Sequence, residues 1–383
     1  MPHHLQHPAR RSLMRATVGL AAASALPLRA QAPGPAGPSR QPIVAQIVDT
    51  SATQVDVAKD FLVGSRAAWK DINARGGIRG KLVQHLVLEV DGSAPSLQDA
   101  FATLKRLPQC LALFGTAADP AASQVARLLQ RELPDTPHVA PWLQNPDGVP
   151  DDSHTFALFA SRREQIAHAV RSLSVMGVSE LGAVYGSPVE FDAYRSDMER
   201  VAAALRMTLK SYRPASSLPQ LGQTLPSDSP RILIFLGGTP ELVQFTQGLE
   251  KQAAQRYVIA MSDVNLQTLL QMGLSRRTPV IATQVVPLVN ANLPIVKAYR
   301  DTLGRLYDEP PTPQSLAGFL AARYTFEMLH SMDAPLTRAN ALQAFQQRGT
   351  LDLGGFRIAL ESRKRSGTYV TQSMVSPDGR LVG

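Results

Sequence analysis

The loop from Gly115 to Ser123 carries the residues best suited to hold a small anion. It follows an apolar run that ends at Phe114 and leads into an expected helix. Its glycine lets the backbone approach a ligand closely, and Thr116 and Asp119 have the spacing of a capping box. Free N–H groups and the positive end of the helix dipole would then face the loop. The pattern predicts a carboxylate site, although an ordinary capped helix start has the same spacing.

Motifs for catalysis and metal binding are absent from the sequence. It contains no G-x-G-x-x-G after an expected strand, no P-loop, no H-E-x-x-H, no G-x-S-x-G and no C-x-x-C. The histidines outside the N-terminal segment are scattered without ligand spacing, at positions 85, 138, 154, 168 and 330. Since no nucleophile–base pair stands out either, we expect neither an enzyme nor a metal or cofactor site.

Length and charge restrict the class of protein further. The chain has 383 residues, which is enough for two domains, and a net charge of +8. Four arginines before residue 33 account for half of that charge, and 8 − 4 leaves +4, which is too little to indicate a nucleic-acid partner. The single cysteine, Cys110, opens an apolar run, so we expect a small buried core residue.

Residues 1–32 have the composition of a signal peptide. Arg10-Arg11 begins a charged segment that resembles a twin-arginine signal, and an alanine-rich apolar stretch too short to span a bilayer follows it. Ala30-Gln31-Ala32 fits a cleavage site, so export to the periplasm is expected; a disordered N-terminus of a cytosolic protein is the alternative. Residues 33–42, rich in Pro, Gly and Ser, predict a flexible lead-in.

From residue 43 onward, short apolar runs alternate with helical patterns in two successive series. Expected strands lie at 43–48, 83–90, 111–114, 137–140, 181–185, 232–236, 257–260 and 280–286. This order predicts an α/β fold with two doubly wound parallel-sheet lobes. Ligands bind beyond the carboxyl ends of such strands, which directs attention to the loops after Val48, Phe114, Ala140, Tyr185, Leu236 and Ala260. At the C-terminus we expect an antiparallel hairpin of 356–360 with 368–376.

One helix organises the first series. Phe61, Ala68 and Ile72 recur at helical spacing and form an apolar stripe. The helix then meets Asn73 and the pair Gly76-Gly77, which can end a helix in the left-handed conformation.

This stretch, from Ile72 to Gly80, resembles the opening of the branched-chain amino acid binding proteins, the periplasmic receptors of ABC importers. The resemblance runs from about Ile43 to Val382 and includes the loop from Phe235 to Glu241, similar to the family's Gly-Gly loop. It implies a type I periplasmic binding protein-like fold with a hinge. The implied N-terminal lobe is 43–160 plus 287–350, and the C-terminal lobe is 161–286 plus 351–383.

The resemblance also implies a set of ligand-binding residues. Thr116 and Ala117 would hold a ligand carboxylate, and Asp263 would bind the α-ammonium group. The remaining implied contacts are Trp142, Gln144, Tyr185 and Thr239. Two departures bear on the ligand: Thr239 stands where the family has a tyrosine, and Asp263 is shorter than the usual glutamate, so an amino group must sit deeper or be bridged by water. Trp142 would favour an aromatic or flat ligand over leucine.

These features together predict an exported solute-binding protein of an ABC importer. Its ligand would be an amino acid or related small carboxylate, bound in the interlobe cleft by hinge closure and delivered to a permease in the inner membrane. A periplasmic sensing domain that presents its ligand to a signalling partner is the alternative.

Overall fold

The computed structural model describes residues 41–146, 149, 154–273, 277–347, 349–358, 367–375 and 381–383. The expected signal peptide, residues 1–32, lies outside the described residues, as does most of the expected lead-in.

The first half of the chain forms a five-stranded sheet in which every paired neighbour is parallel. Its strands are β1 (Ile43–Asp49), β2 (Gln84–Val90), β3 (Cys110–Phe114), β4 (His138–Val139) and β5 (Thr155–Phe156), in the order β2-β1-β3-β4-β5. Every residue of β1 is buried, as expected for a parallel strand with both faces covered.

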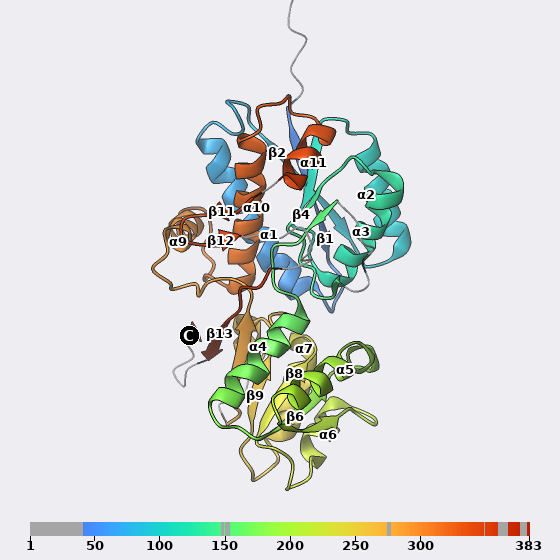
Figure 1. Ribbon diagram of the computed structural model, residues 1–383, viewed down its shortest axis with the longest axis vertical. Coiled ribbons are helices and arrows are strands. Elements are labelled where there is room, and N and C mark those ends of the chain that lie inside the picture. Colours follow the sequence, from blue (N-terminus) through green and yellow to red (C-terminus); the bar gives the residue numbers. More distant parts are fainter. Residues whose placement is uncertain are drawn as a thin grey trace, which may run out of the picture. The chain divides into compact units, whose positions relative to one another are not determined.

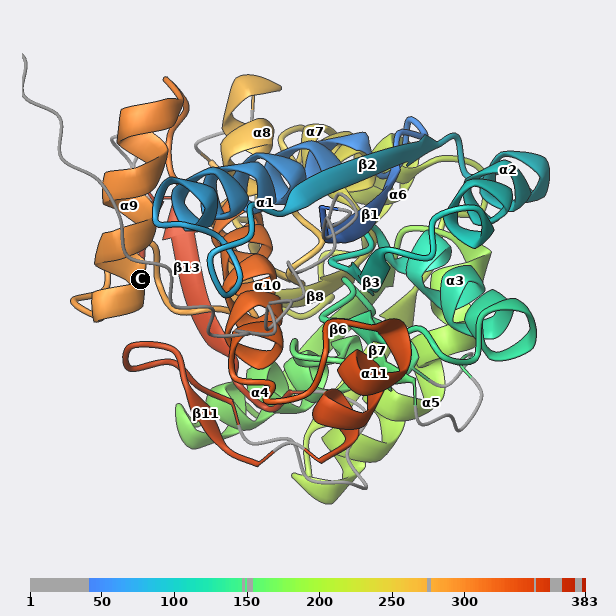
Figure 2. The ribbon, with the colours of Figure 1, turned by 90° about the horizontal axis from the view of Figure 1, so that it is seen from above.

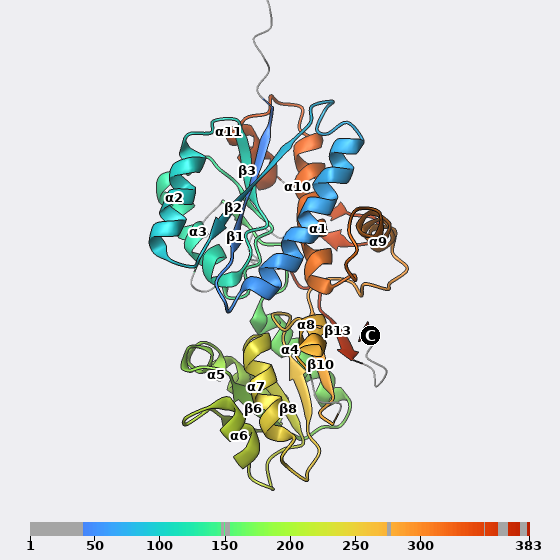
Figure 3. The ribbon, with the colours of Figure 1, turned by 180° about the vertical axis from the view of Figure 1, so that it is seen from behind.

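Helices cover both faces of this sheet. Helices α2 (Ala94–Lys105) and α3 (Asp119–Glu132) lie on one face, and α1 (Val55–Ala74) with α10 (Pro313–His330) lies on the other (Figures 1 and 3). Two further helices, α9 (Pro294–Leu306) and α11 (Arg338–Gln346), complete the same core. The alternation along β1 matches this arrangement, because Ile43, Ala45 and Ile47 contact one cluster while Val44 and Val48 contact the other.

The second sheet has seven strands. They are β6 (Glu180–Tyr185), β7 (Thr208–Tyr212), β8 (Ile232–Leu236), β9 (Tyr257–Ala260), β10 (Val280–Gln284), β13 (Thr371–Val375) and β14 (Leu381–Val382), in the order β14-β13-β10-β9-β8-β6-β7. The five strands from β7 to β10 in that order are parallel, whereas β13 and β14 are antiparallel additions at one edge. The helices of this half are α4 (Arg162–Val175), α5 (Pro188–Ala204), α6 (Leu218–Thr224), α7 (Thr239–Leu249) and α8 (Leu266–Gln271).

The two sheets confirm the predicted α/β fold with two doubly wound series, but the predicted C-terminal hairpin is wrong. The segment β12 (Arg357–Ile358) pairs with β11 (Leu351–Asp352), and β13 pairs with β10 and β14 instead. Strand β7 and helix α6 were not predicted. Strand β7 lies at the sheet edge and is only half-buried, so its sequence lacks the continuous apolar run of a central strand.

Helices α1 and α10 pack with their backbones in close approach (Figure 2). A Cβ atom at Gly64 would lie 1.7 Å from the carbonyl oxygen of Ser315, and one at Gly318 would lie 1.9 Å from that of Phe61. Only glycine fits at both positions, because the nearest atoms belong to the opposing backbone. The predicted apolar stripe of α1 is fully buried in this interface.

Cys110 is buried at the start of β3, as predicted, and burial raises the pKa of its thiol to about 11. Among the described residues, no helix combines the length and the apolar character that a membrane-spanning helix needs.

Candidate ligand-binding site

A cavity of about 110 Å³ lies at the carboxyl ends of strands from both sheets. Its lining is predominantly polar and consists of Thr53, Gln54, Val57, Asp119, Pro120, Arg162, Gly186, Ser187, Glu190, Gly237, Gly238, Glu241 and Asp263. These residues follow β1, β3, β5, β6, β8 and β9 in the chain. The cavity therefore occupies the position that doubly wound sheets use for ligands.

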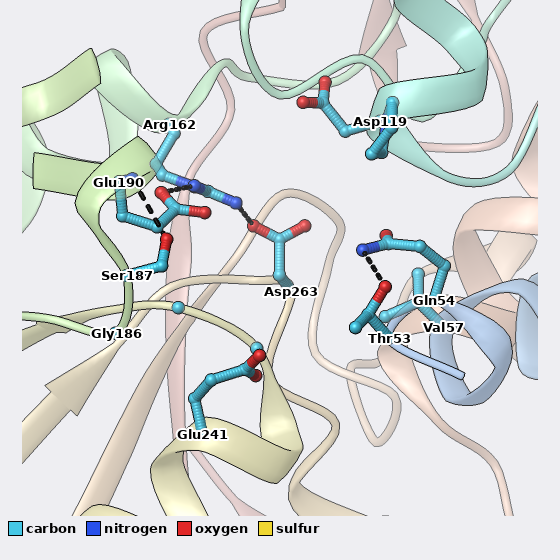
Figure 4. A pocket seen from close by; sticks show the side chains of 13 residues that line it. Thr53, Gln54, Val57, Asp119, Arg162, Gly186, Ser187, Glu190, Glu241 and Asp263 are labelled. Atoms are coloured by element: carbon cyan, nitrogen blue, oxygen red, sulfur yellow. Dashed lines mark hydrogen bonds and ion pairs between the residues drawn. The ribbon is translucent and has the colours of Figure 1, made fainter. Parts of the chain in front are cut away.

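Arg162 is the central charged group of the cavity (Figure 4). It opens helix α4, whose start is fixed by a reciprocal capping box between Ser161 and Glu164. The guanidinium donates to the carboxylates of Glu190 and Asp263, and only 6% of the residue is exposed. Burial lowers the pKa of Arg162, but these two carboxylates outweigh burial and raise it, so the group stays charged.

The Asp263 carboxylate accepts hydrogen bonds from two side chains, the predicted site residue Trp142 and the unpredicted Arg162. One carboxylate oxygen accepts from the indole N–H of Trp142 at 3.1 Å, and the other accepts from Arg162. Trp142 is 1% exposed and packs edge-on against Phe61, so its ring supports the carboxylate from behind the cavity rather than lining it. The structure thus brings two of the predicted residues, Trp142 and Asp263, into direct contact.

Asp119, the first residue of α3, presents a second carboxylate to the same space. One of its oxygens accepts from the backbone N–H groups of Gln144 and Asn145, at 2.5 and 3.0 Å. Burial raises the pKa of the Asp119 carboxyl, and the nearby Arg162 guanidinium offsets this rise only in part. In Figure 4, Asp119 and Gln54 lie on one side and Arg162 and Glu190 on the other, with Asp263 between them and Glu241 on the start of α7.

The predicted residues Thr116 and Ala117 lie behind the cavity, outside its lining. The hydroxyl of Thr116 is bonded to His138 Nε2 at 2.8 Å, and the N–H of Ala117 donates to the carbonyl of Ile47. The Ala117 N–H is therefore already paired within the protein, and a carboxylate contact of Thr116 and Ala117 stays a prediction. The expected capping box is wrong, because Ala118 is the N-cap of α3 and makes no side-chain cap.

The other predicted residues are buried and contact neighbouring side chains of the protein. Gln144 accepts from Gln165 Nε2 at 2.6 Å, and Tyr185 packs edge-on against Phe191. The Thr239 hydroxyl donates to Asp56 at 2.6 Å. None of the three lines the cavity, so a direct contact of Gln144, Tyr185 or Thr239 with ligand stays a prediction.

Helix α1 is joined to the starts of α7 and α8 by hydrogen bonds that we call the α1 contacts. They comprise the bond from Thr239 to Asp56 and a bond from the Asn265 amide to Asp60 at 2.9 Å. The Asn265 backbone N–H also donates to the Thr239 hydroxyl, which links the two bonds. These bonds connect the helices of one sheet to those of the other beside the cavity.

Sequence reasoning missed four of the five charged lining residues. Asp119, Glu190 and Glu241 each stand five residues after the end of a strand (114 to 119, 185 to 190 and 236 to 241). That shared spacing was a usable signal for a row of acids around one site. Among the described residues, no three His, Cys, Asp or Glu side chains come close enough to form a metal-binding group.

Comparison with known proteins identifies a family and solved structures that share this fold. Residues 43–375 match the model of the periplasmic binding protein family. An extracellular ligand-binding receptor from Verminephrobacter eiseniae superposes with a TM-score of 0.79 at 20% identity, covering 90% of this chain and 100% of that one. A branched-chain amino acid transporter substrate-binding protein, LivJ from Streptococcus pneumoniae, bound to isoleucine, gives 0.76 at 11%, covering 90% and 98%.

A fatty acid ABC transporter substrate-binding protein from Thermomonospora curvata gives a TM-score of 0.77 at 13% identity, covering 89% and 90%. No curated protein matches this chain. At these identities the solved structures establish the shared fold.

Proposed function

This chain belongs to the periplasmic binding protein family, a class of solute-binding proteins rather than enzymes, and we propose that it is the receptor of an ABC importer. In this role the protein is exported to the periplasm by the signal peptide expected at residues 1–32. It captures a small solute and delivers it to a permease in the inner membrane. The family match over residues 43–375 and the ABC transporter receptors among the structural neighbours support this role.

The proposed ligand is an amino acid or a related small solute that carries an ammonium group. The observation that carries this assignment is the contact between Asp263 and Arg162 inside the cavity, which offers charges of both signs. An ammonium group would replace part of the Arg162 contact at Asp263, while a carboxylate would be met by the guanidinium. Trp142 fixes the orientation of Asp263 for this purpose.

Ligand capture proceeds by hinge closure between lobes of residues 43–160 plus 287–350 and residues 161–286 plus 351–383. The lining supports this division, because Gln54 and Asp119 come from the first set while Glu190 and Asp263 come from the second. A solute that contacts both sets binds the closed form more tightly and shifts the population toward it.

Asp263→Asn tests the assignment of the ammonium partner. Asparagine keeps an oxygen for the Trp142 N–H but removes the charge, so affinity for an amine-bearing ligand should fall at least tenfold. Ligands are first found by thermal shift, since a solute at about 100 times its Kd adds about 2.7 kcal/mol of stability. Calorimetry then compares the variant with Asp301→Asn, an exposed position on α9. Equal affinity in the two variants would remove Asp263 from the site.

A further inference from the structure

The charges that line the cavity do not balance. Four lining residues carry carboxylates, namely Asp119, Glu190, Glu241 and Asp263, and one carries a guanidinium, Arg162. With all of them ionised, the sum is 1 − 4 = −3. A cleft lined by one sign of charge raises the local concentration of ligands of the opposite sign and disfavours those of the same sign.

Among the described residues, Arg162 forms ion pairs with two of the four acids and is in direct contact with neither of the other two. Its guanidinium contacts Glu190 and Asp263. Within the described part of the chain, Asp119 forms no ion pair, and its bonds are to backbone N–H groups. Glu241, in the first turn of α7, has neither an ion pair nor a hydrogen bond there. Both carboxylates nevertheless line the cavity, so a cationic ligand could form the ion pairs that Asp119 and Glu241 lack.

The shape and the remaining lining favour the same class of ligand. Apart from three glycines, the lining contains only two apolar side chains, Val57 and Pro120. An aliphatic side chain or a lipid tail would therefore meet few apolar side chains there. The volume of about 110 Å³ is also small beside the roughly 300–1,000 Å³ of pockets for drug-sized ligands.

We propose that the ligand is a small solute of net positive charge, with two amine or guanidinium groups and at most one carboxylate. One cationic group meets Asp263, as proposed above, and is also faced by Asp119, while the other cationic group faces Glu241. A carboxylate, where present, meets Arg162. Basic amino acids and short diamines have this chemistry. The inference rests on the proposed function, because it names the ligand class of the same cavity.

The test compares ligands that differ in charge and little else. Calorimetry at low salt measures the binding of lysine, arginine and putrescine, with norleucine as the partner of lysine that lacks the terminal ammonium group, and with glutamate as an anion. We expect lysine or putrescine to bind at least 100-fold more tightly than norleucine and glutamate. Tighter binding of norleucine or glutamate would overturn the charge assignment and leave the receptor function intact. Failure of every solute in the panel to bind would overturn both.

Two variants connect the preference to the uncompensated acids. Asp119→Asn and Glu241→Gln should each weaken the cationic ligand at least tenfold and should not weaken norleucine. Glu199→Gln is the matched control, because Glu199 lies exposed on α5 in an ion pair with Arg195. Thermal melting of each variant checks that the fold is retained. If both site variants bind the cation as the control does, the two acids do not select the ligand.

Discussion

The guanidinium of Arg162 lies between two cavity carboxylates, those of Glu190 and Asp263, and compensates the negative charge of both. Glu190 and Asp263 are mostly buried, with side-chain exposures of 23% and 14%, and a buried carboxylate without a partner would be strongly destabilising. Arg162 is the first residue of α4, the helix that follows the last strand of the first sheet and precedes the first strand of the second. A ligand that enters the cavity therefore meets charged side chains already held in place, which reduces the cost of organising the site on binding.

Asp119 makes ligand binding dependent on pH. In the free protein, burial raises the pKa of this carboxyl; the facing groups are Arg162 on α4, Asp263 after β9, and the backbone N–H groups of Gln144 and Asn145. A bound cation lowers that pKa, so binding releases a proton between the two values. Affinity should rise with pH through this interval, by at most tenfold per pH unit for one proton. Calorimetry in two buffers of different ionisation enthalpy measures the proton release.

Asp119→Asn provides the control for this pH dependence. The variant cannot titrate at this position, so its affinity should be flat over the same interval. A proton release that persists in Asp119→Asn would assign the titration to another group.

At the scale of elements, the contact between α1 and α10 depends on two glycines. Gly64→Ala or Gly318→Ala would place a Cβ within 2 Å of an opposing backbone oxygen, and the helices must separate to relieve it. Because a backbone cannot swing aside as a flexible side chain can, we expect a loss near the top of the range for overpacking, about 3 kcal/mol of unfolding free energy. Urea denaturation measures the change.

Gly304→Ala on α9 is the matched control for that experiment. Gly304 is an exposed helical glycine, and no atom would lie within 4 Å of an added Cβ. Alanine should stabilise the helix there by about 0.5–1 kcal/mol. Destabilisation of similar size at all three positions would show that helical glycines, rather than the interface, set the cost.

Elements with strong local patterns could be predicted from the sequence. The buried runs of β1, β3 and β8 and the glycine stop of α1 carry their own signals, and each is observed. The predicted pairing of the C-terminal strands was wrong because the sequence of a five-residue strand does not show which strand it pairs with. Strand β13 pairs across 87 positions with β10, as between Thr371 and Gln284 (371 − 284), and no local pattern encodes such a pairing.

The same distinction separates the predicted from the unpredicted parts of the site. The rule that ligands bind beyond strand ends directed attention to the loops after β1, β3, β6, β8 and β9, and all five contribute residues to the cavity lining. The choice of side chain within a loop depended on distant partners. The Thr116 hydroxyl is bonded to His138, which lies on the next strand. The Arg162 guanidinium in the cavity is bonded to Glu190 and Asp263, which come much later in the chain.

At the scale of the whole receptor, the α1 contacts stabilise the approach of the two lobes proposed above. Thr239→Val removes the donor to Asp56 and the acceptor of the Asn265 N–H. A hydrogen bond to a charged group contributes about 1.5–3 kcal/mol, so the ratio of closed to open form should fall roughly tenfold to 100-fold. Small-angle X-ray scattering without ligand should show a larger radius of gyration, and affinity should fall in parallel.

Thr208→Val on the exposed edge strand β7 is the comparison for this variant. It makes the same chemical change away from the contact between the lobes and should leave both the scattering and the affinity unchanged. An unchanged radius in Thr239→Val, with normal thermal stability, would mean that the α1 contacts do not hold the closed form.

The burial of the single cysteine allows this protein to be converted into an optical sensor of ligand binding. Maleimide dyes react with the thiolate form of cysteine. Cys110 is buried and has a pKa of about 11, so it stays protonated at neutral pH and will not react with them. Val189→Cys would then be the sole reactive thiol, at a position 75% exposed and directly before the cavity residue Glu190. A dye attached there would sit at the rim of the binding cavity, and its fluorescence would report occupancy without removal of the native cysteine.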